Sequence, residues 1–272
     1  MKIDYIKKIY STYKKLHLFY WNKTFNGKYN VGDLFSLLIV RYLSPYKVTY
    51  TPRYTPFPLK LCAVGSLIND SILMTGGIFW GTGMLVPKVK KHIAPAIFTA
   101  VRGPLTRRSL LAAGYKCPDI YGDPALLLPQ IYQPTNKVKK YKFGVICHWR
   151  HIDFIRCEGD VKFINILRAE EEAWSFIDEI CECEIILSSS LHGIIIANAY
   201  NIPAKQIVFE GFPLEGDPLK KFHDYYASVH MPVQNPLYLK KGETINNNTK
   251  IEHDKTIDLN IDLKKLYEAF PF

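Results

Sequence analysis

Ser188-Ser189-Ser190-Leu191-His192-Gly193 joins two apolar runs of different period, and this junction decides the expected fold. The run before it, residues 183–187, is predicted to be a buried strand, and the run after it, residues 194–200, has helical spacing until Asn201 and Pro203 stop it. A helix that starts there offers unpaired backbone N–H groups and a partial positive charge. The junction therefore predicts an anion site, in which the His192 side chain can change its charge near neutral pH.

Similar pairs of an apolar run and a helical pattern occur on both sides of this junction. We expect strands over residues 61–66, 71–77, 96–101, 143–147, 161–166 and 204–209, and helices over residues 34–43, 105–113, 170–181, 218–228 and 262–270. Strands that alternate with helices predict parallel sheets that helices cover on both faces. The lysine-rich stretch 133–142 is the best linker candidate. We therefore expect an α/β protein of two domains, residues 1–135 and 136–272, with a cleft between their strand ends and a terminal helix that returns to the first domain.

The chain is basic, with 35 Lys and Arg against 25 Asp and Glu in 272 residues and a formal net charge of +10. This balance favours an anionic partner, either a phosphorylated substrate or an acidic membrane face. No RNA- or DNA-binding motif is visible, so we expect no nucleic-acid partner. Residues 1–21 interleave lysines with aromatic and aliphatic side chains and predict a basic amphipathic helix. It either packs on its own domain, the interpretation we favour, or makes peripheral contact with an anionic membrane.

The sequence predicts neither a membrane-spanning segment nor a metal site. No apolar run is long enough to cross a bilayer, and the first residues lack the apolar core of a signal peptide. We expect a cytoplasmic protein, with the inner membrane face as the alternative location. The six cysteines are scattered, and only Cys181 and Cys183 form a C-x-C pair. We expect buried reduced thiols, no metal ligands and no bound cofactor.

Polar residues and glycines follow the strands expected in the first domain. Asn30-Val31-Gly32-Asp33 precedes a helical pattern, where Asp33 is either an ordinary N-cap or faces a cleft together with Asn30. Trp80-Gly81-Thr82-Gly83 contains glycines that let backbone N–H groups approach a ligand. Arg102 comes at a strand's carboxyl end, where an arginine either grips a phosphate or carboxylate or forms a structural salt bridge.

Three further polar residues complete the set of candidates. Asp123 either braces the cleft or caps the next turn. The first strand of the second domain delivers His148 and Arg150 at its carboxyl end, where open α/β sheets bind ligands.

Six stretches, taken in order, resemble the polysaccharide pyruvyl transferase family. They are Asn30-Val31-Gly32-Asp33, Trp80-Gly81-Thr82-Gly83, Val101-Arg102-Gly103-Pro104-Leu105-Thr106, Gly122-Asp123-Pro124-Ala125-Leu126-Leu127-Leu128-Pro129, Gly144-Val145-Ile146-Cys147-His148, and Ser188 through Gly193. No single stretch is specific, whereas six in the family's order and spacing are. The resemblance covers roughly residues 26–230.

This resemblance implies two Rossmann-like domains that face each other across a cleft, as in the two-domain glycosyltransferases of GT-B type. It implies phosphoenolpyruvate as the donor and co-substrate, and two hydroxyls of a sugar residue, free or lipid-linked, as the acceptor. The product would be a cyclic pyruvate ketal on a cell-surface or exopolysaccharide precursor. The first domain would lie on the acceptor side and the second on the donor side.

The resemblance also implies roles for residues. It places His192 in the donor site, and the residue before its leucine, often arginine in relatives, is Ser190 here. We therefore expect Arg102 or Arg150 to supply the missing charge. The remaining donor contacts are expected from His148, Ser189, Ser190 and Leu191, and the cleft on the acceptor side from Asn30, Gly32, Trp80 and Asp123.

Ketal formation needs a proton on the methylene carbon of the donor and a base for the sugar hydroxyls. Our hypothesis assigns His192 as the acid and Asp33 as the base. His148 is the competing acid. Alternatively, the phosphate of the donor relays the protons, which would leave His192 as a binding residue only.

Two other functions are consistent with the same pattern. A nucleotide-sugar glycosyltransferase of the same architecture would be protected from thermal unfolding by a nucleotide sugar and not by phosphoenolpyruvate. A non-catalytic saccharide-binding protein would bind glycan without turnover. The substitution at Ser190 favours the second alternative, whereas the retained His192, Arg102 and Asp33 argue against it.

Overall fold

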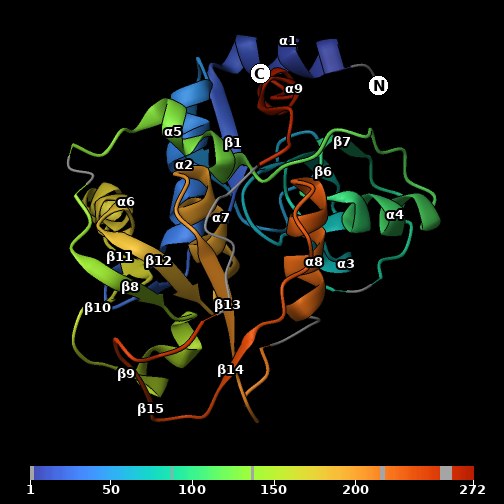
Figure 1. Ribbon diagram of the computed structural model, residues 1–272. Coiled ribbons are helices and arrows are strands. Elements are labelled where there is room, and N and C mark those ends of the chain that lie inside the picture. Colours follow the sequence, from blue (N-terminus) through green and yellow to red (C-terminus); the bar gives the residue numbers. More distant parts are fainter. Residues whose placement is uncertain (1–2, 87, 136–137, 215–217, 252–258) are drawn as a thin grey trace.

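The computed structural model describes residues 3–86, 88–135, 138–214, 218–251 and 259–272, and its first half is built on a parallel sheet of five strands (Figure 1). The strand order is β4-β1-β5-β6-β7. The strands are β1 (Lys15–Phe19), β4 (Lys47–Tyr50), β5 (Leu61–Cys62), β6 (Gly77–Trp80) and β7 (Ala96–Ala100). Neighbouring residues of these strands pack into cores on opposite faces of the sheet, as Ile78 and Phe79 do, so both faces are covered.

The second half repeats this design. Its five parallel strands have the order β10-β8-β12-β13-β14. They are β8 (Tyr141–Ile146), β10 (Val161–Phe163), β12 (Cys183–Ser188), β13 (Ala204–Phe209) and β14 (Leu237–Leu239). In the central strand β12, Ile186 pairs with Gly144 on one side and Ala204 on the other. The expected α/β class with parallel, Rossmann-like sheets is confirmed.

Helices and two small sheets surround these strands. The helices are α1 (Ile3–Tyr13), α2 (Val31–Leu43), α3 (Asp70–Leu73), α4 (Pro104–Ala112), α5 (Leu128–Ile131), α6 (Ala173–Cys181), α7 (Leu191–Ala199), α8 (Pro218–Ser228) and α9 (Leu263–Glu268), with 3-10 turns η1 (Pro124–Leu127), η2 (Trp149–Phe154) and η3 (Glu170–Glu172). An antiparallel sheet joins β2 (Thr24–Phe25) and β3 (Lys28–Asn30) of the first half to β11 (Leu167–Arg168) of the second. A parallel pair joins β9 (Ile155–Cys157) to β15 (Glu243–Ile245).

One hydrophobic core runs through both halves. Leu61 and Ile78 of the first sheet belong to the same buried cluster as Ile146 and Ile186 of the second. Helix α2 is buried over most of its length and packs on α6, while η1 packs on both α2 and α7. The starts of α2 and α7 are therefore fixed relative to each other by shared packing. Burial of this kind stabilises by about 25 cal/mol per Å² of apolar surface.

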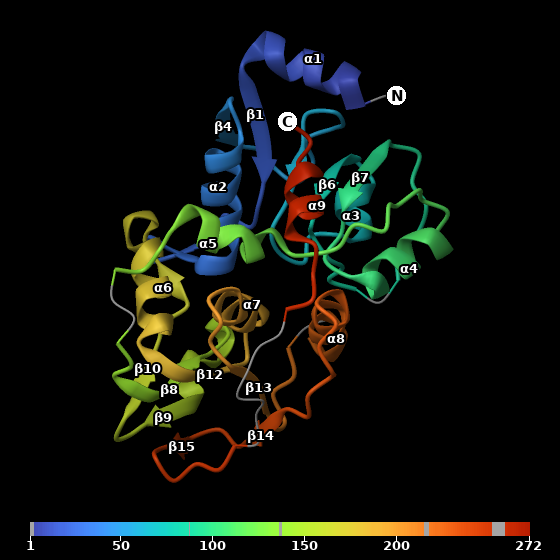
Figure 2. The same ribbon diagram turned by 45° about the horizontal axis from the view of Figure 1, so that its top comes forward.

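The C-terminal helix packs on the first half. The Trp80 indole Nε1–H donates to the Leu266 carbonyl at 2.8 Å, and the Trp80 and Phe270 ring centroids lie 4.9 Å apart. Figure 2 shows α9 beside β6. The connection at residues 136–137, on which the predicted domain boundary falls, lies outside the described residues.

Two predicted elements are wrong. The helix expected over residues 1–21 ends at Tyr13, and β1 follows as an inner strand of the first sheet, with Leu16 and Leu18 fully buried. Apolar and polar side chains alternate from residue 15 to residue 18, which is the period of a strand. This alternation determines the structure here, although the lysine-rich composition also fits a helix. The strand expected over residues 71–77 is helix α3 followed by a turn, because Asn69 caps it by accepting a hydrogen bond from Ile72 N–H at 3.1 Å.

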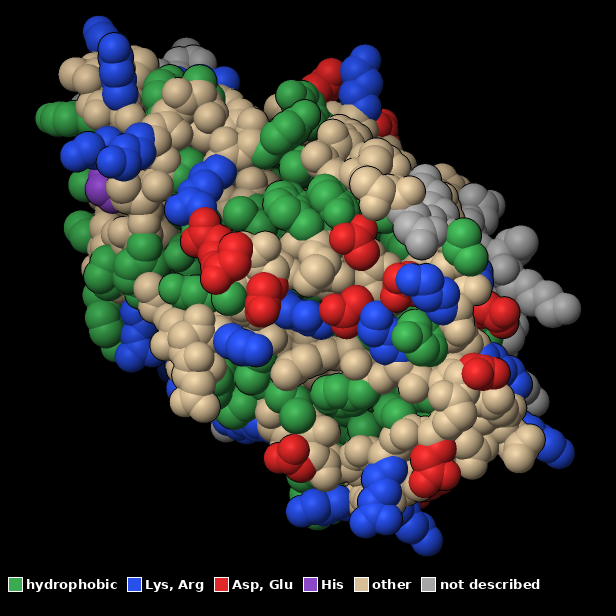
Figure 3. Space-filling view, turned by 90° about the vertical axis from the view of Figure 1, so that its left-hand side faces the viewer, with side chains coloured by type: hydrophobic (Ala, Val, Ile, Leu, Met, Phe, Trp, Pro, Cys, Tyr) green, Lys and Arg blue, Asp and Glu red, His purple; other side chains and the backbone are tan. Residues whose placement is uncertain are grey.

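Basic and acidic side chains lie next to each other on part of the surface. On the face shown in Figure 3, Lys and Arg side chains lie beside Asp and Glu side chains instead of forming a field of one sign. Two ion pairs of the second half, Arg168–Glu179 at 2.9 Å and Lys162–Glu182 at 3.0 Å, are of this kind. Among the residues described, no helix combines the length and apolar character needed to cross a membrane. The six cysteines are free thiols, and five of them are buried.

Candidate functional site

The two sheets point their carboxyl ends at a pocket of about 400 Å³. Loops that follow parallel strands, together with the start of α2, supply its wall. The first half contributes Asn30, Asp33, Gly65 and Ser66, and the second contributes His148, Arg150, Ser190, Leu191, His192 and Lys221. A pocket in this place is the usual ligand site of open α/β sheets.

His192, from the start of α7, and Asp33, from the start of α2, line this pocket from different halves. A Cβ placed on Gly65 would lie 3.8 Å from His192 Cε1 and 3.9 Å from Asp33 Oδ1, so the two side chains converge on one point. A Cβ on Gly32 would overlap the His192 ring itself. Glycine at position 32 is therefore required for the ring to lie against α2.

Asp123 lies on the other side of the His192 ring. Its Oδ1 accepts a hydrogen bond from Ala125 N–H at 3.0 Å and so caps η1, while its Oδ2 lies 3.8 Å from His192 Nε2. Asp123 is fully buried, and neither Oδ2 nor Nε2 has a hydrogen-bond partner among the described residues. Both predicted roles of Asp123, the cap and the brace, are thus compatible with its position.

Asp33 is a carboxyl group of the pocket lining whose pKa is shifted. Burial raises its pKa from 3.8 to about 7, although His192 acts in the opposite direction. A carboxyl group with this pKa is partly protonated near pH 7, and its carboxylate is a stronger base than an exposed aspartate. Asp33 can therefore take up or release a proton near neutral pH.

The start of α7 leaves backbone donors available to a ligand. The N-cap residue Ser190 makes no side-chain capping hydrogen bond. The turn is held instead by Ser188, whose Oγ accepts from Ser190 N–H at 3.0 Å, and by Ser189, whose Oγ accepts from His148 N–H at 2.8 Å. Because Gly193 packs directly on the Ser188 hydroxyl, a side chain there would push the turn apart. The geometry suits an anion at this helix start.

His148 is a poor proton donor in this position. Burial, together with Lys221, His151 and Arg150, lowers its pKa to about 3. Its Nδ1 accepts a hydrogen bond from Arg150 N–H at 3.3 Å, so the neutral ring carries its proton on Nε2. A neutral imidazole at pH 7 can bind a substrate but does not act as a general acid of ordinary strength.

Two basic side chains of the second half, Arg150 and Lys221, line the pocket. Burial, reinforced by Arg102, lowers the pKa of Lys221 from 10.5 to about 8. Among the described residues Lys221 has no carboxylate partner within ion-pair distance. Its charge is therefore available to an anionic ligand.

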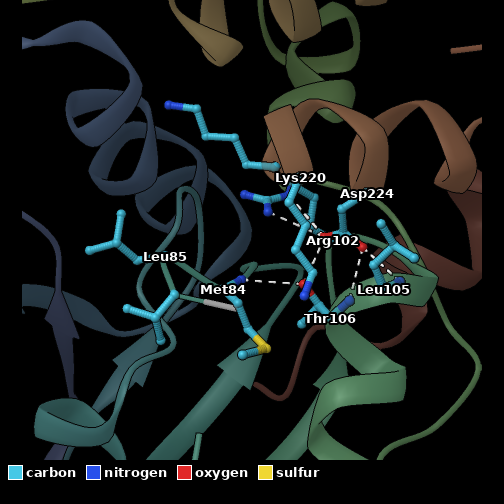
Figure 4. Close-up of a pocket in the computed structure, with 9 residues that line it drawn as sticks. Met84, Leu85, Arg102, Leu105, Thr106, Lys220 and Asp224 are labelled. Atoms are coloured by element: carbon cyan, nitrogen blue, oxygen red, sulfur yellow. Dashed lines mark hydrogen bonds and ion pairs between the residues drawn. The ribbon is translucent and has the colours of Figure 1, made fainter. Parts of the chain in front are cut away.

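Arg102 does not reach this pocket, because Asp224 of α8 holds it. The guanidinium lies 3.2 Å from Asp224 Oδ2, donates to Ser66 Oγ at 2.7 Å, and is 1% exposed. Asp224 also accepts from Leu105 N–H, Thr106 N–H and the Thr106 hydroxyl, which ties α8 to the start of α4 (Figure 4). The adjoining cavity measures about 10 Å³, room for a single water. Of its two predicted roles, Arg102 has the structural salt bridge.

Comparison with known proteins gives this pocket its context. Residues 3–204 match the family described as Polysaccharide pyruvyl transferase. The chain belongs to this family. It is 28% identical over 265 residues to an uncharacterised protein of Acanthamoeba polyphaga mimivirus, covering 92% of this chain and 87% of the relative. It is 26% identical over 193 residues to the succinoglycan biosynthesis protein ExoV of Rhizobium meliloti (strain 1021), covering 68% of this chain and 57% of ExoV.

One solved structure is similar at low level. A functionally uncharacterised protein of Klebsiella pneumoniae aligns with 88% of this chain and 99% of its own, at 10% identity and a TM-score of 0.45.

Most of the residues singled out from the sequence come together in the structure. His192, Asp33, Asn30, His148, Arg150, Ser190 and Leu191 line one pocket, and Gly32 and Asp123 touch His192 from behind. Gly32 and Asp123 do not line the pocket themselves, and the remaining three residues contact neither the pocket nor the His192 ring. Arg102 is engaged with Asp224, Ser189 is buried behind the turn, and Trp80 is fully buried against α9.

Sequence reasoning missed several residues of the pocket. Lys221, Ser66, Trp21, Lys23, Phe25 and Trp149 all line it. Ser66 and Lys221 fall inside stretches noted only as strand and helix, and the aromatic residues lie in short segments without a period. Within the described ranges, no group of three or more His, Cys, Asp or Glu side chains is placed to hold a metal ion.

Proposed function

We propose that this pyruvyl transferase moves the pyruvyl group of phosphoenolpyruvate onto two hydroxyls of one sugar residue and forms a cyclic ketal. The observation that carries the proposal is that Asp33 and His192, from the starts of two helices in different halves, line one pocket and both lie within 4 Å of the position that a Cβ on Gly65 would take. The membership of the family and the similarity to ExoV support pyruvyl transfer to a polysaccharide.

The charge of the pocket suits this donor. Phosphoenolpyruvate carries up to about three negative charges, which a partly buried site must offset. Arg150, Lys221 and the uncapped start of α7 provide positive charge in the pocket. Since Arg102 is neutralised by Asp224, we assign to Lys221 the compensating role that the sequence suggested for Arg102.

The reaction balances without an oxidant or reductant. A proton adds to the methylene carbon of the donor and makes the neighbouring carbon oxocarbenium-like. One sugar hydroxyl oxygen bonds to that carbon, the C–O bond to phosphate breaks, and the second hydroxyl oxygen closes the ring. Of the two hydroxyl protons, one is accounted for by the new methyl group and the other by the released phosphate.

We assign His192 as the acid and Asp33 as the base in these steps. The pKa of about 7 at Asp33 lets it take a hydroxyl proton near neutral pH. The pKa of about 3 at His148 argues against the competing assignment of that residue as the acid. Asp123 Oδ2, which lies 3.8 Å from His192 Nε2, is placed to hold the ring in position.

The test is a matched pair of asparagine variants. His192→Asn should reduce phosphate release from phosphoenolpyruvate, in the presence of pyranoside acceptors, by at least about 100-fold. The control His230→Asn, at an exposed site with φ of 55° that asparagine tolerates, should keep wild-type activity. Wild-type activity in His192→Asn would refute the assignment, and a nucleotide-sugar donor in place of phosphoenolpyruvate would refute the proposed reaction.

A further inference from the structure

Two aromatic rings from different halves meet at the pocket wall. Phe25, from β2 of the first half, and Trp149, from η2 of the second, have ring centroids 4.8 Å apart and planes inclined by 38°. Both line the pocket and are partly exposed, and Trp21 lines it as well. Large aromatic side chains that stay open to a polar pocket usually serve a ligand.

Two cations lie against these rings. Lys23 Nζ is 5.1 Å from the centroid of Phe25 and 5.3 Å from that of Trp149, and Arg150 Cζ is 5.0 Å from that of Trp149. At these distances cation–π attraction favours both cations beside the rings. Lys23 is exposed at the pocket wall, and among the described residues it has no carboxylate partner within ion-pair distance.

The donor needs charge but not these rings, since phosphoenolpyruvate is small and highly polar. A pyranose ring, in contrast, has a face of C–H groups that packs on a flat aromatic ring, with hydroxyls at its edge. The His148 and Trp149 rings lie 5.5 Å apart, so this surface borders the polar part of the pocket. A sugar held here is within the same cavity as Asp33 and His192.

We infer that Phe25 and Trp149 form the acceptor subsite, on which a pyranose ring packs, and that Lys23 pairs with an anionic group of that saccharide, a carboxylate or a phosphate. This inference rests on the proposed function. It names the acceptor class as an acidic pyranoside, and it explains why the subsite is divided between the halves: an acceptor bridges Phe25 and Trp149.

The role of the Trp149 ring is tested by replacing it with side chains of different shape. Trp149→Leu keeps an apolar side chain but loses the flat face, so the KM for p-nitrophenyl pyranosides should rise at least about 10-fold while the KM for phosphoenolpyruvate stays within about twofold. Trp149→Phe should restore most of the acceptor affinity. The control Tyr238→Leu removes a ring that is 56% exposed on β14, outside the pocket, and should change neither KM. An unchanged acceptor KM in Trp149→Leu, or an equal rise in both KM values, would overturn the inference.

The role of the Lys23 charge is tested by a second pair of variants. Wild-type protein should prefer glucuronides and pyranoside phosphates over neutral glucosides, and Lys23→Gln should abolish that preference. The control Lys28→Gln, which replaces an exposed lysine of β3, should keep it. The glucuronide and phosphate arms show which anion is preferred. Equal use of neutral and acidic acceptors by the wild type would contradict the role of Lys23.

Binding can be followed without turnover. Saturation-transfer NMR on the same pyranosides should show ring protons in contact with wild-type protein and lose them in Trp149→Leu, even if phosphoenolpyruvate proves not to be the donor. Retained contact in Trp149→Leu would refute the subsite, whatever the reaction.

Discussion

Asp33 lies in a position that costs stability when it is charged. Its pKa is about 7 in the folded protein and near 3.8 in a solvated chain. The unfolded chain therefore releases this proton from about pH 4, whereas the folded chain holds it to about pH 7. The contribution of Asp33 to the free energy of unfolding falls as the pH rises through this window. Shifted pKa values of this kind are common at functional sites, where the titrating group takes part in the reaction.

Asp33→Asn should remove this loss. We expect the variant to be more stable than wild type by roughly 2–4 kcal/mol at about pH 8, a figure reduced for the partial exposure of the side chain, and the difference to vanish toward pH 4. Urea unfolding at several pH values measures it, and the same variant should lose phosphate release. The exposed Asp119→Asn is the control. A stability difference that does not change with pH would show that Asp33 ionises normally.

Lys221 predicts a pH dependence of its own for the proposed donor site. Its pKa of about 8 means that the positive charge is lost as the pH rises through about 8. We expect the KM for phosphoenolpyruvate to increase above this pH in wild type and to stay flat in Lys221→Arg, since arginine keeps its charge. Steady-state kinetics between about pH 7 and pH 9 decide this. The same rise in both proteins would assign the effect to another group.

At the scale of secondary-structure elements, the site depends on the contact between the start of α2 and the start of α7. Asn30 caps α2 by accepting from Gly32 N–H at 3.0 Å, and Gly32 gives the His192 ring its place. Such starts could be predicted from the sequence because caps, glycines and helical period are local signals. The strand β1 was missed because the lysines around Leu16 and Leu18 also fit a helix. Phe25, Trp149 and Lys221 could not be predicted as pocket residues, because only tertiary packing brings their segments together.

Gly32→Ala tests the contact between the two helix starts. Alanine suits a helix better than glycine by about 1 kcal/mol, so the variant should fold. Its methyl group would displace His192, and kcat should fall roughly 100-fold, as expected for a misplaced catalytic group. Circular dichroism melting and phosphate release together measure both effects. Gly114→Ala, at φ of +84° with no atom near the new methyl, should instead lose stability and keep its activity.

At the scale of the whole molecule, Asp224 ties the second half to the first. It accepts hydrogen bonds from the start of α4 and pairs with Arg102, and both Gly83 and Gly103 leave room for this contact. The shared core and this buried ion pair fix the two walls of the pocket relative to each other. The sequence predicted both halves and their order, but it gave Arg102 a ligand role as readily as this structural one.

Asp224→Asn should destabilise the protein by about 3–5 kcal/mol, because it leaves the buried Arg102 guanidinium without its counter-charge. Urea unfolding followed by tryptophan fluorescence measures this loss, with the exposed Asp119→Asn as control. A loss below about 1 kcal/mol would mean that the ion pair contributes little to joining the halves.

We propose that His192 and Asp33, which line one pocket from different halves, transfer a pyruvyl group from phosphoenolpyruvate to a saccharide. It is tested most directly by running the reaction in deuterium oxide with an acidic pyranoside and examining the product by mass spectrometry and NMR. We expect a carboxyethylidene ketal whose methyl group carries one deuterium from the solvent, and no such product from His192→Asn. A product without the ketal, a methyl group free of deuterium, or an equal yield from His192→Asn would contradict it.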